Sequence, residues 1–322
     1  MSDKNQLKIL ILTKEFDKLY PKQKPKYDFF RSVEKFAEVR YWHKDGEINF
    51  ILENLDFTPD FIFHYDITGY AFSPKITGLD NIEIPKGTYV IDEHWNPTER
   101  RKYFNDNKID LIFSATKEAF LKRYPSYKDK FRFLPLSINP ALIKDWNIDR
   151  DIDFLLMGLL STGSYPFRKA VLNKFENEKG FVHYPHPGHT TKDVNAIINE
   201  RYAKELNRTK IFFTCGSKYK YPVAKFFEAL GCNTLLLAKP NNDIYELGFK
   251  DGENFIACDC STVYQKAIYY LSNQEERERI SMNGYRFVHQ YHTNDVRAKE
   301  FLSSLYTFLE KKNGGTTNES QI

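Results

Sequence analysis

Glu228 is a carboxylate on a predicted helix whose other face is apolar. Apolar residues recur at helical spacing from Val223 to Leu230 and predict one buried stripe, with Glu228 on the opposite face. Pro222 suits the first helical turn, and Gly231 is placed to end the helix. Since helix N-termini attract anions, this helix could hold phosphate while Glu228 binds ribose hydroxyls. The alternative is a solvent-exposed glutamate without a ligand.

The loop before this helix adds positive charge at the same place. Lys218, Lys220 and Tyr221 follow a predicted strand and lead directly into the helix. Lysine side chains beside a helix N-terminus would reinforce its attraction for phosphate. We therefore assign these three residues, with Glu228, to a predicted site for a nucleotide and its phosphates.

A second phosphate-contacting segment is predicted where another strand ends. Gly158 closes an apolar run and Gly163 lies in the loop after it, so the backbone could approach a phosphate closely. Arg168 follows in the next helix, where its charge could neutralise a leaving diphosphate. The alternative is that the segment from Tyr165 to Arg168 begins a helix and only packs.

Asp92, Glu93 and His94 are the candidate catalytic residues. They come directly after a predicted strand in the first half of the chain. A histidine or carboxylate at a strand end could move a proton or orient an acceptor hydroxyl. The alternative is that this loop only caps the helix that begins near Pro97.

Two further segments have a superficial likeness to metal sites. His183, His186 and His189 share a stretch with two prolines and a glycine, which indicates an irregular loop without the carboxylates of known metal motifs. The acidic segment from Asp149 to Asp153 precedes a predicted strand, which is typical of a solvated linker. We expect the histidines to contact phosphate or no ligand, in preference to a metal.

Two series of short apolar runs alternate with helical segments and would position these residues. The first series comprises residues 7–12, 38–42, 61–65, 88–91, 111–115 and 131–134. The second comprises residues 153–158, 181–184, 211–214, 234–238 and 254–257. This alternation predicts the α/β class, with parallel sheets and helices on both faces. Two series predict two Rossmann-like domains, with a boundary near residues 140–150.

Composition narrows the class of protein. The chain has 322 residues, enough for two domains, and its 47 Lys and Arg against 43 Asp and Glu give a net charge of only +4. A strong field for nucleic acid is therefore not expected. Apolar runs are too short for a signal-peptide core or a membrane span, so we expect a cytoplasmic protein, with peripheral membrane contact left open. The four cysteines lack zinc-ribbon spacing and are typical of reduced thiols.

The segment from Tyr221 to Asp259 resembles the C-terminal domain of GT-B glycosyltransferases of group 1 (GT4-like), in the CgeB-like, spore-maturation-type branch. The resemblance rests on the Glu-Ala pair at Glu228, on the phrase from Phe249 to Asn254, and on residues 274–284 before a final helix. It covers residues 151–305 well, and the first half of the chain only in layout.

The resemblance implies two Rossmann-like domains that face a central cleft, with the C-terminal helix crossing back to the first domain. We expect an acceptor domain over residues 1–145, completed by the helix at 294–311, which would contribute Phe301. A nucleotide-sugar donor domain would cover residues 146–293. Residues 312–322 would form a disordered tail.

The resemblance also implies transfer of a sugar from a nucleoside-diphosphate sugar to an acceptor hydroxyl, with retention of configuration and without a required metal or other cofactor. The loop with Asn241 and Asn242 would pass near the donor sugar, although both residues also suit a turn or helix cap. Lys220 departs from the family, because many members carry there a glutamate that contacts the transferred sugar. This departure leaves the identity of the sugar open, and makes an inactive or repurposed member conceivable.

Other functions share the expected architecture. A non-catalytic nucleotide-sugar-binding protein and a nucleotide-sugar epimerase or hydrolase are the alternatives, and the fold alone does not separate them. A nucleic-acid glycosyltransferase is less consistent with the small net charge. The acceptor could be a glycan, a lipid-linked molecule, a protein or a small molecule, and the sequence does not decide among them.

Overall fold

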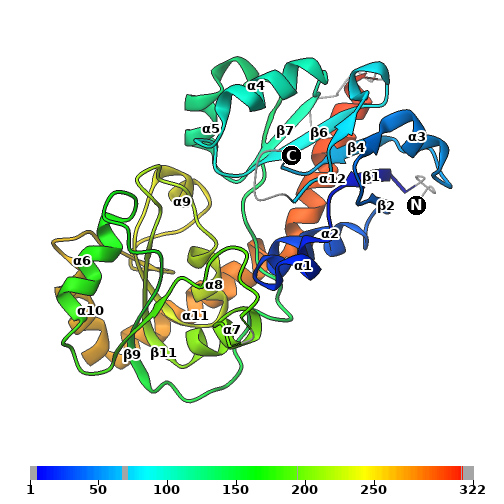
Figure 1. The fold of residues 1–322 in the computed structure, drawn as a ribbon. Coiled ribbons are helices and arrows are strands. Elements are labelled where there is room, and N and C mark those ends of the chain that lie inside the picture. The colour runs from blue at the N-terminus through cyan, green and yellow to red at the C-terminus, as the bar shows by residue number, and fades with distance from the viewer. Residues whose placement is uncertain (1–5, 67–71, 194, 313, 315–322) are drawn as a thin grey trace.

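The computed structural model describes residues 6–66, 72–193, 195–312 and 314, which form two α/β domains (Figure 1). The disordered tail expected at residues 312–322 lies almost entirely outside the described residues. Each domain is built on one parallel sheet, as the alternation of apolar runs predicted.

The first sheet has six strands in the order β2-β1-β4-β6-β7-β8, and every neighbouring pair is parallel. Its strands are β1 (Lys8–Leu12), β2 (Glu38–Trp42), β4 (Phe61–His64), β6 (Lys86–Val90), β7 (Leu111–Ser114) and β8 (Phe131–Phe133). A separate small pair is formed by β3 (Gly46–Glu47) and β5 (Ile76–Thr77).

The second sheet has five parallel strands in the order β10-β9-β11-β12-β13. Its strands are β9 (Ile152–Gly158), β10 (Phe181–Pro185), β11 (Thr209–Cys215), β12 (Leu235–Lys239) and β13 (Ile256–Ala257). Every strand expected from the sequence is therefore present, with small shifts at the ends.

Helices connect the strands and cover both faces of each sheet. The α-helices are α1 (Phe16–Leu19), α2 (Lys24–Val33), α3 (Ile48–Glu53), α4 (Pro97–Asp106), α5 (Lys117–Arg123), α6 (Pro166–Phe175), α7 (Asn199–Asn207), α8 (Lys225–Gly231), α9 (Asn242–Glu246), α10 (Val263–Ser272), α11 (Gln274–Tyr291) and α12 (Asn294–Lys312). Short 3-10 turns lie at η1 (Pro21–Gln23), η2 (Leu79–Asn81) and η3 (Pro125–Tyr127).

Helix α8 begins at Lys225, three residues later than the sequence indicated, and ends at Gly231. The backbone N–H of Phe226 donates to the carbonyl of Val223, so the entry is a tight i to i+3 turn. The expectation that Pro222 occupies the first helical turn was therefore wrong. The later start leaves Tyr221 in the preceding loop, where its side chain is free to reach the other domain.

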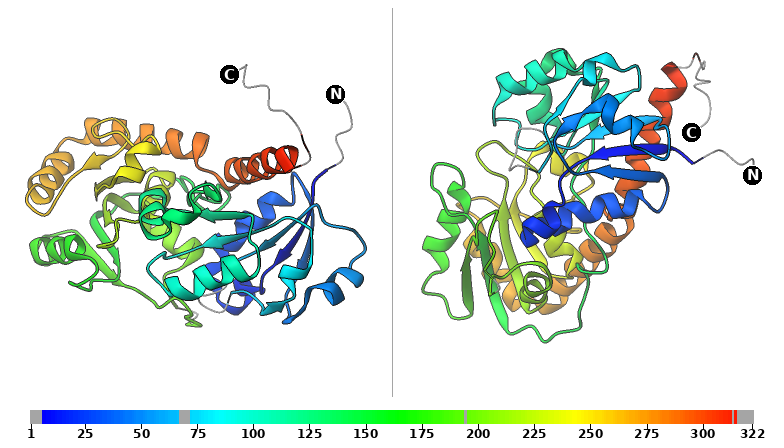
Figure 2. Two further views of the ribbon diagram at one scale, coloured as in Figure 1. Left: turned by 90° about the horizontal axis from the view of Figure 1, so that it is seen from above. Right: turned by 45° about the vertical axis from the view of Figure 1, so that its right-hand side comes forward.

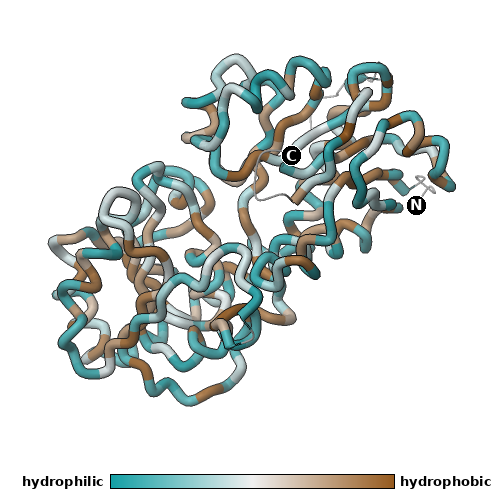
Figure 3. Tube along the Cα trace, viewed as in Figure 1, coloured by the Kyte–Doolittle hydropathy of each residue, from teal (hydrophilic) through white to brown (hydrophobic). Residues whose placement is uncertain are grey.

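The second domain shows why its strands are apolar runs. Along β9, Leu155 and Met157 belong to one core cluster, and Phe154 and Leu156 to another. Successive side chains of a strand point to opposite faces, so this alternation places a hydrophobic core on each side of the sheet. The trace coloured by hydropathy shows brown stretches through the interiors of both domains (Figure 3).

Helix α12 leaves the second domain and packs against the first (Figures 1 and 2). Phe301 lies in the core of the first domain, with ring centroids 5.0 Å from both Phe63 and Phe113. Leu305 is buried in the same cluster and Leu309 packs against its edge. The first domain is therefore built from the two ends of the described chain.

The chain passes between the domains twice, and the two passages lie side by side. In the linker after β8, Ile138 forms a parallel bridge with Thr293, which stands between α11 and α12. The N–H of Ile138 donates to the carbonyl of His292 (3.0 Å), and the N–H of Asn294 donates to the carbonyl of Ile138 (2.8 Å). Among the described residues, no helix is long and apolar enough to cross a membrane.

Phe301→Ala should destabilise the first domain by about 3–5 kcal/mol, because it removes a fully buried ring and leaves a cavity. Urea unfolding followed by fluorescence measures the effect. Phe50→Ala is the matched control, since Phe50 is 56% exposed and should lose less than about 1 kcal/mol. Equal stability losses in the two variants would contradict the assignment of α12 to the first core.

Candidate active site

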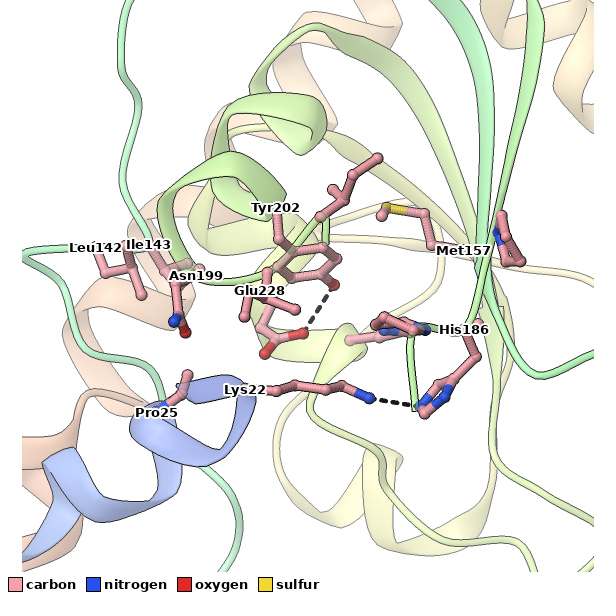
Figure 4. Close-up of a pocket in the computed structure, with 15 residues that line it drawn as sticks. Lys22, Pro25, Leu142, Ile143, Met157, His186, Asn199, Tyr202 and Glu228 are labelled. Carbon is pink, nitrogen blue, oxygen red and sulfur yellow. Dashed lines mark hydrogen bonds between the residues drawn. The ribbon is translucent and has the colours of Figure 1, made fainter. Parts of the chain in front are cut away.

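A pocket lies between the two domains, next to the carboxyl end of β9. Lys22 and Pro25 line it from the first domain, and Glu228 lines it from the second (Figure 4). Gly158 and Lys225 of the second domain also line it. Its remaining wall is mainly aliphatic, with Leu142, Ile143, Met157, Pro185, Pro187, Ile197 and Ile198. An apolar wall with a few convergent polar groups is typical of a small-molecule site, and open α/β sheets bind ligands at this edge.

Glu228 lies in this pocket, on the exposed side of α8, as the apolar stripe predicted. The hydroxyl of Tyr202 donates to its Oε2 at 2.8 Å (Figure 4). Nζ of Lys225 lies 4.9 Å from the centre of the Tyr202 ring. Burial lowers the pKa of Lys225. One carboxylate oxygen is thus held by the tyrosine, and the carboxylate lines the pocket.

Lys22 and His186 meet across the domain interface, with Nζ and Nε2 2.6 Å apart (Figure 4). Burial and the nearby Lys225 and Lys26 lower the pKa of Lys22 to about 7. Burial and Lys22 lower the pKa of His186 to about 3. The backbone N–H of Gly188 donates to Nδ1 of His186, so Nε2 carries the proton of the neutral ring and can donate to Lys22 when the amine of Lys22 is neutral.

Gly158 and Arg168 lie together at the end of β9. Gly158 has φ +123° and lines the pocket, and a Cβ there would lie 2.9 Å from Nη1 of Arg168. Arg168 is 3% exposed, donates to the carbonyl of Cys215 at 3.1 Å, and stacks on Tyr165 at 4.1 Å. The guanidinium of Arg168 lies behind Gly158, and Arg168 does not itself line the pocket. Gly163 is exposed and does not line the pocket either.

The basic loop before α8 is arranged differently from expectation. Lys218 and Lys220 are exposed, neither lines the pocket, and Lys220 has φ +60°. Tyr221 is 8% exposed and its hydroxyl contacts the first domain at His94. In this arrangement Tyr221 serves the domain interface, and the lysines that enter the pocket are Lys22 and Lys225.

The three candidate catalytic residues have three different environments. His94 is half-buried and bonds to Tyr221, with Nδ1 2.8 Å from the hydroxyl. Glu93 is 1% exposed, accepts a hydrogen bond from Ser114, and burial raises its pKa. Asp92 has φ +55°, and its carbonyl accepts from Arg100 at 2.8 Å. His94 therefore contacts Tyr221 of the second domain.

Asn241 and Asn242 both have structural partners. The side chain of Asn241 caps α9 by accepting from the N–H of Ile244 at 3.0 Å, while its Nδ2 is buried without a partner. Asn242 donates to Glu118 of the first domain at 2.8 Å. The helix cap that the sequence also suggested thus describes Asn241, and contact of either residue with a sugar stays a prediction.

Asp243 joins the domains on the side of the cleft formed by α5 and α9. Its carboxylate accepts from the backbone N–H groups of Lys117 (2.9 Å) and Glu118 (3.0 Å), at the start of α5. Thr116 precedes this helix and makes no side-chain cap. Lys117 also pairs with Glu246. A helix of the first domain is therefore capped by a residue of the second.

The segments with a likeness to metal sites do not form one. Within the described parts of the chain, no group of three or more His, Cys, Asp or Glu side chains could hold a metal ion. His186 and His189 lie 4.8 Å apart between ring centres, at the domain interface. Asp151 pairs with Arg208 and Asp153 with Lys210. The acidic segment is therefore used in ion pairs.

Lys22, Lys225 and Tyr202 line the pocket but had no role in the sequence prediction. Lys22 belongs to a lysine-rich segment near the N-terminus, and this clustering of positive charge was the one sequence feature that could have indicated a phosphate contact there. Lys225 stands one turn before Glu228 and could have been found from helical spacing. Tyr202 comes from α7, and nothing in its local sequence distinguishes it from a core aromatic residue.

Comparison with known proteins identifies the second half of the chain. Residues 143–303, half of the chain, match the model of a family described as glycosyl transferase-like. No curated protein sequence matched the chain.

Solved structures share the fold over nearly the whole chain. Anabaena Alr3699/HepE, solved in complex with UDP-glucose, is similar with a TM-score of 0.61 at 12% identity, covering 94% of this chain and 100% of HepE. Sucrose-phosphate synthase from Thermosynechococcus elongatus gives 0.60 at 11% identity, covering 95% and 100%. A glycosyltransferase from Rickettsia africae gives 0.60 at 11%, covering 95% and 99%. These likenesses show the two-domain GT-B fold.

Asp243→Ala should weaken the contact between the domains by about 1 kcal/mol, because α5 loses the acceptor for its first N–H groups. Small-angle scattering should show a larger radius of gyration. Glu246→Ala is the control, since its pair with Lys117 is exposed and contributes less than about 1 kcal/mol. An Asp243→Ala variant as compact as the control would contradict the role of Asp243.

Proposed function

Because the chain belongs to the glycosyl transferase-like family and is a glycosyltransferase, we propose that it transfers a sugar from a nucleoside-diphosphate sugar to an acceptor hydroxyl. One observation carries this proposal: Glu228, Tyr202, Lys225 and Gly158 meet in one pocket at the carboxyl end of the second sheet. The similar structure of HepE was solved with UDP-glucose, which favours a UDP-sugar donor.

The pocket offers groups for the ribose and for the diphosphate of such a donor. Glu228, held on one side by Tyr202, has a free oxygen for ribose hydroxyls. Lys22 and Lys225 lie on the pocket wall and would bind the diphosphate from opposite domains. Arg168 beneath Gly158 adds positive charge without direct contact. Cations placed around a leaving diphosphate stabilise the charge that develops in the transition state.

We further propose that transfer proceeds with retention and without a required metal, within the CgeB-like branch of group 1. The lysines at the pocket would supply the neutralising charge that a metal supplies elsewhere. His94 and Asp92, at the end of the first sheet, would contact the acceptor or the transferring sugar. Lys220 occupies the place of the family's sugar-contacting glutamate, so other groups must hold the sugar.

Glu228→Ala should weaken binding of the matching nucleoside diphosphate by about 10- to 100-fold, since hydrogen bonds to a carboxylate contribute roughly 1.5–3 kcal/mol. Titration calorimetry with UDP, GDP, ADP and TDP measures this. Glu275→Ala, an exposed glutamate of α11, is the control and should bind as the wild type does. No binding of any nucleotide by the wild type, or equal binding by Glu228→Ala, would refute the donor site.

Incubation with the matching nucleotide sugar separates the remaining alternatives. A transferase releases nucleoside diphosphate, slowly without an acceptor and faster with one. An epimerase would return an altered nucleotide sugar, and a binding protein would leave the sugar intact. Either of these two results would overturn the proposed activity.

UDP binding near pH 8 should take up a proton at Lys22. With a pKa of about 7 its amine is mostly neutral in the free protein, and a diphosphate favours the ammonium. The affinity for UDP should therefore fall as the pH rises above about 7, because the free protein then binds fewer protons than the UDP complex does.

Calorimetry in two buffers of different ionisation enthalpy measures this proton uptake. Lys22→Gln should abolish it. Lys24→Gln is the matched control, because Lys24 is exposed and pairs with Asp28. Equal binding enthalpies in both buffers for the wild type would contradict the prediction.

A further inference from the structure

Two tyrosines of the second domain enclose His94 of the first. The ring of Tyr219 stacks on His94 with 3.9 Å between centres and 16° between planes. The hydroxyl of Tyr221 lies 2.8 Å from Nδ1 of His94 and 3.2 Å from its backbone nitrogen. The imidazole is therefore held by side chains that the other domain supplies.

The two contacts with Tyr221 leave two arrangements for the proton of His94, which differ in the group that accepts the hydroxyl proton. A backbone N–H can only donate, so the hydroxyl oxygen accepts from the N–H of His94. The hydroxyl proton is then free to donate to Nδ1, which must be unprotonated to accept it. When Nδ1 accepts the hydroxyl proton, the proton of the neutral imidazole lies on Nε2.

Glu93 is the competing acceptor for the hydroxyl proton, because it is the buried carboxylate next to His94 and, after burial, its charge raises the pKa of Tyr221. Its Oε1 accepts from Ser114, and its Oε2 makes no hydrogen bond. The geometry thus favours Nδ1 of His94 over Glu93. A proton of Tyr221 on Glu93 would instead require Nδ1 to carry a proton, and the two arrangements are distinguishable by experiment.

The groups that face His94 keep its ring neutral. Burial lowers the pKa of His94, and Arg100, Arg123 and Lys218 lower it further, while Asp92 opposes them. No described residue accepts a hydrogen bond from Nε2. The ring therefore has one committed nitrogen and one free N–H donor.

We propose that Tyr221 is a positioning residue that fixes His94 as the Nε2–H tautomer across the domain interface, so that His94 donates a hydrogen bond to a substrate oxygen and does not act as a general base. The substrate part of this inference rests on the proposed function. The tautomer part does not, because it follows from contacts within the protein. No proton leaves His94 in this role.

Nitrogen-15 NMR of histidine-labelled protein tests the tautomer without any substrate. His94→Gln assigns the resonance. The wild type should show a protonated Nε2 and an unprotonated Nδ1, and Tyr221→Phe should show a mixture of both tautomers. Tyr219→Phe is the matched control and should leave the signal unchanged, because the Tyr219 hydroxyl bonds to no described residue. A wild-type His94 protonated on Nδ1, or a Tyr221→Phe spectrum like that of the wild type, would overturn the proposal.

Kinetics tests the role of the donor. Tyr221→Phe should lower kcat about tenfold, which corresponds to about 1.4 kcal/mol, with little change in the KM for the nucleotide sugar. His94→Gln keeps an N–H donor and should retain more activity than His94→Ala, whereas loss of a general base would make the two equal. Equal activities would overturn the donor role. Absence of nucleotide binding with the predicted tautomer present would refute the proposed function alone.

Discussion

A buried guanidinium holds together the two places where the chain passes between the domains. Arg297 is 2% exposed and donates to the carbonyls of Pro135 (3.1 Å) and Tyr291 (3.3 Å), as well as to Glu300 and to Nδ1 of His292. A buried charge is tolerated only when such partners surround it. Because Pro135 belongs to the linker and Tyr291 to the junction of α11 and α12, the same cation fixes both passages. The relative orientation of the two sheets, and with it the shape of the cleft between the domains, depends on these contacts of Arg297.

The fold was largely predictable from the sequence because parallel strands buried on both faces are short apolar runs. Strands such as β9 and β11 have no polar alternation and stand out between helical segments. The start of α8 was not predictable, since Pro222 suits both a first helical turn and the tight turn that the chain forms. Local preferences did not distinguish the two. The contact of Tyr221 with the other domain is a tertiary interaction.

The candidate site was predictable only where its chemistry is local. Glu228 could be located because it lies opposite the apolar stripe of its own helix. Gly158 could be located because it ends a strand. The partners of Glu228 come from elsewhere: Tyr202 from α7 and Lys22 from the first domain. Their meeting depends on how two domains face each other, which no pattern within one segment encodes. The sequence consequently indicated the nearby Lys218 and Lys220, which are exposed.

The return of α12 to the first domain has a consequence for the order in which the protein is made. Ala298, Phe301 and Leu305 complete a core whose other members, such as Phe63 and Phe113, are synthesised much earlier. Domains fold largely as units while the chain emerges from the ribosome. The second sheet, from β9 to β13, is fully emerged before the last helix of the first domain exists. The first domain is therefore the last to be completed during synthesis. Until α12 is made, the face of its sheet that carries Phe63 and Phe113 lacks the helix that covers it.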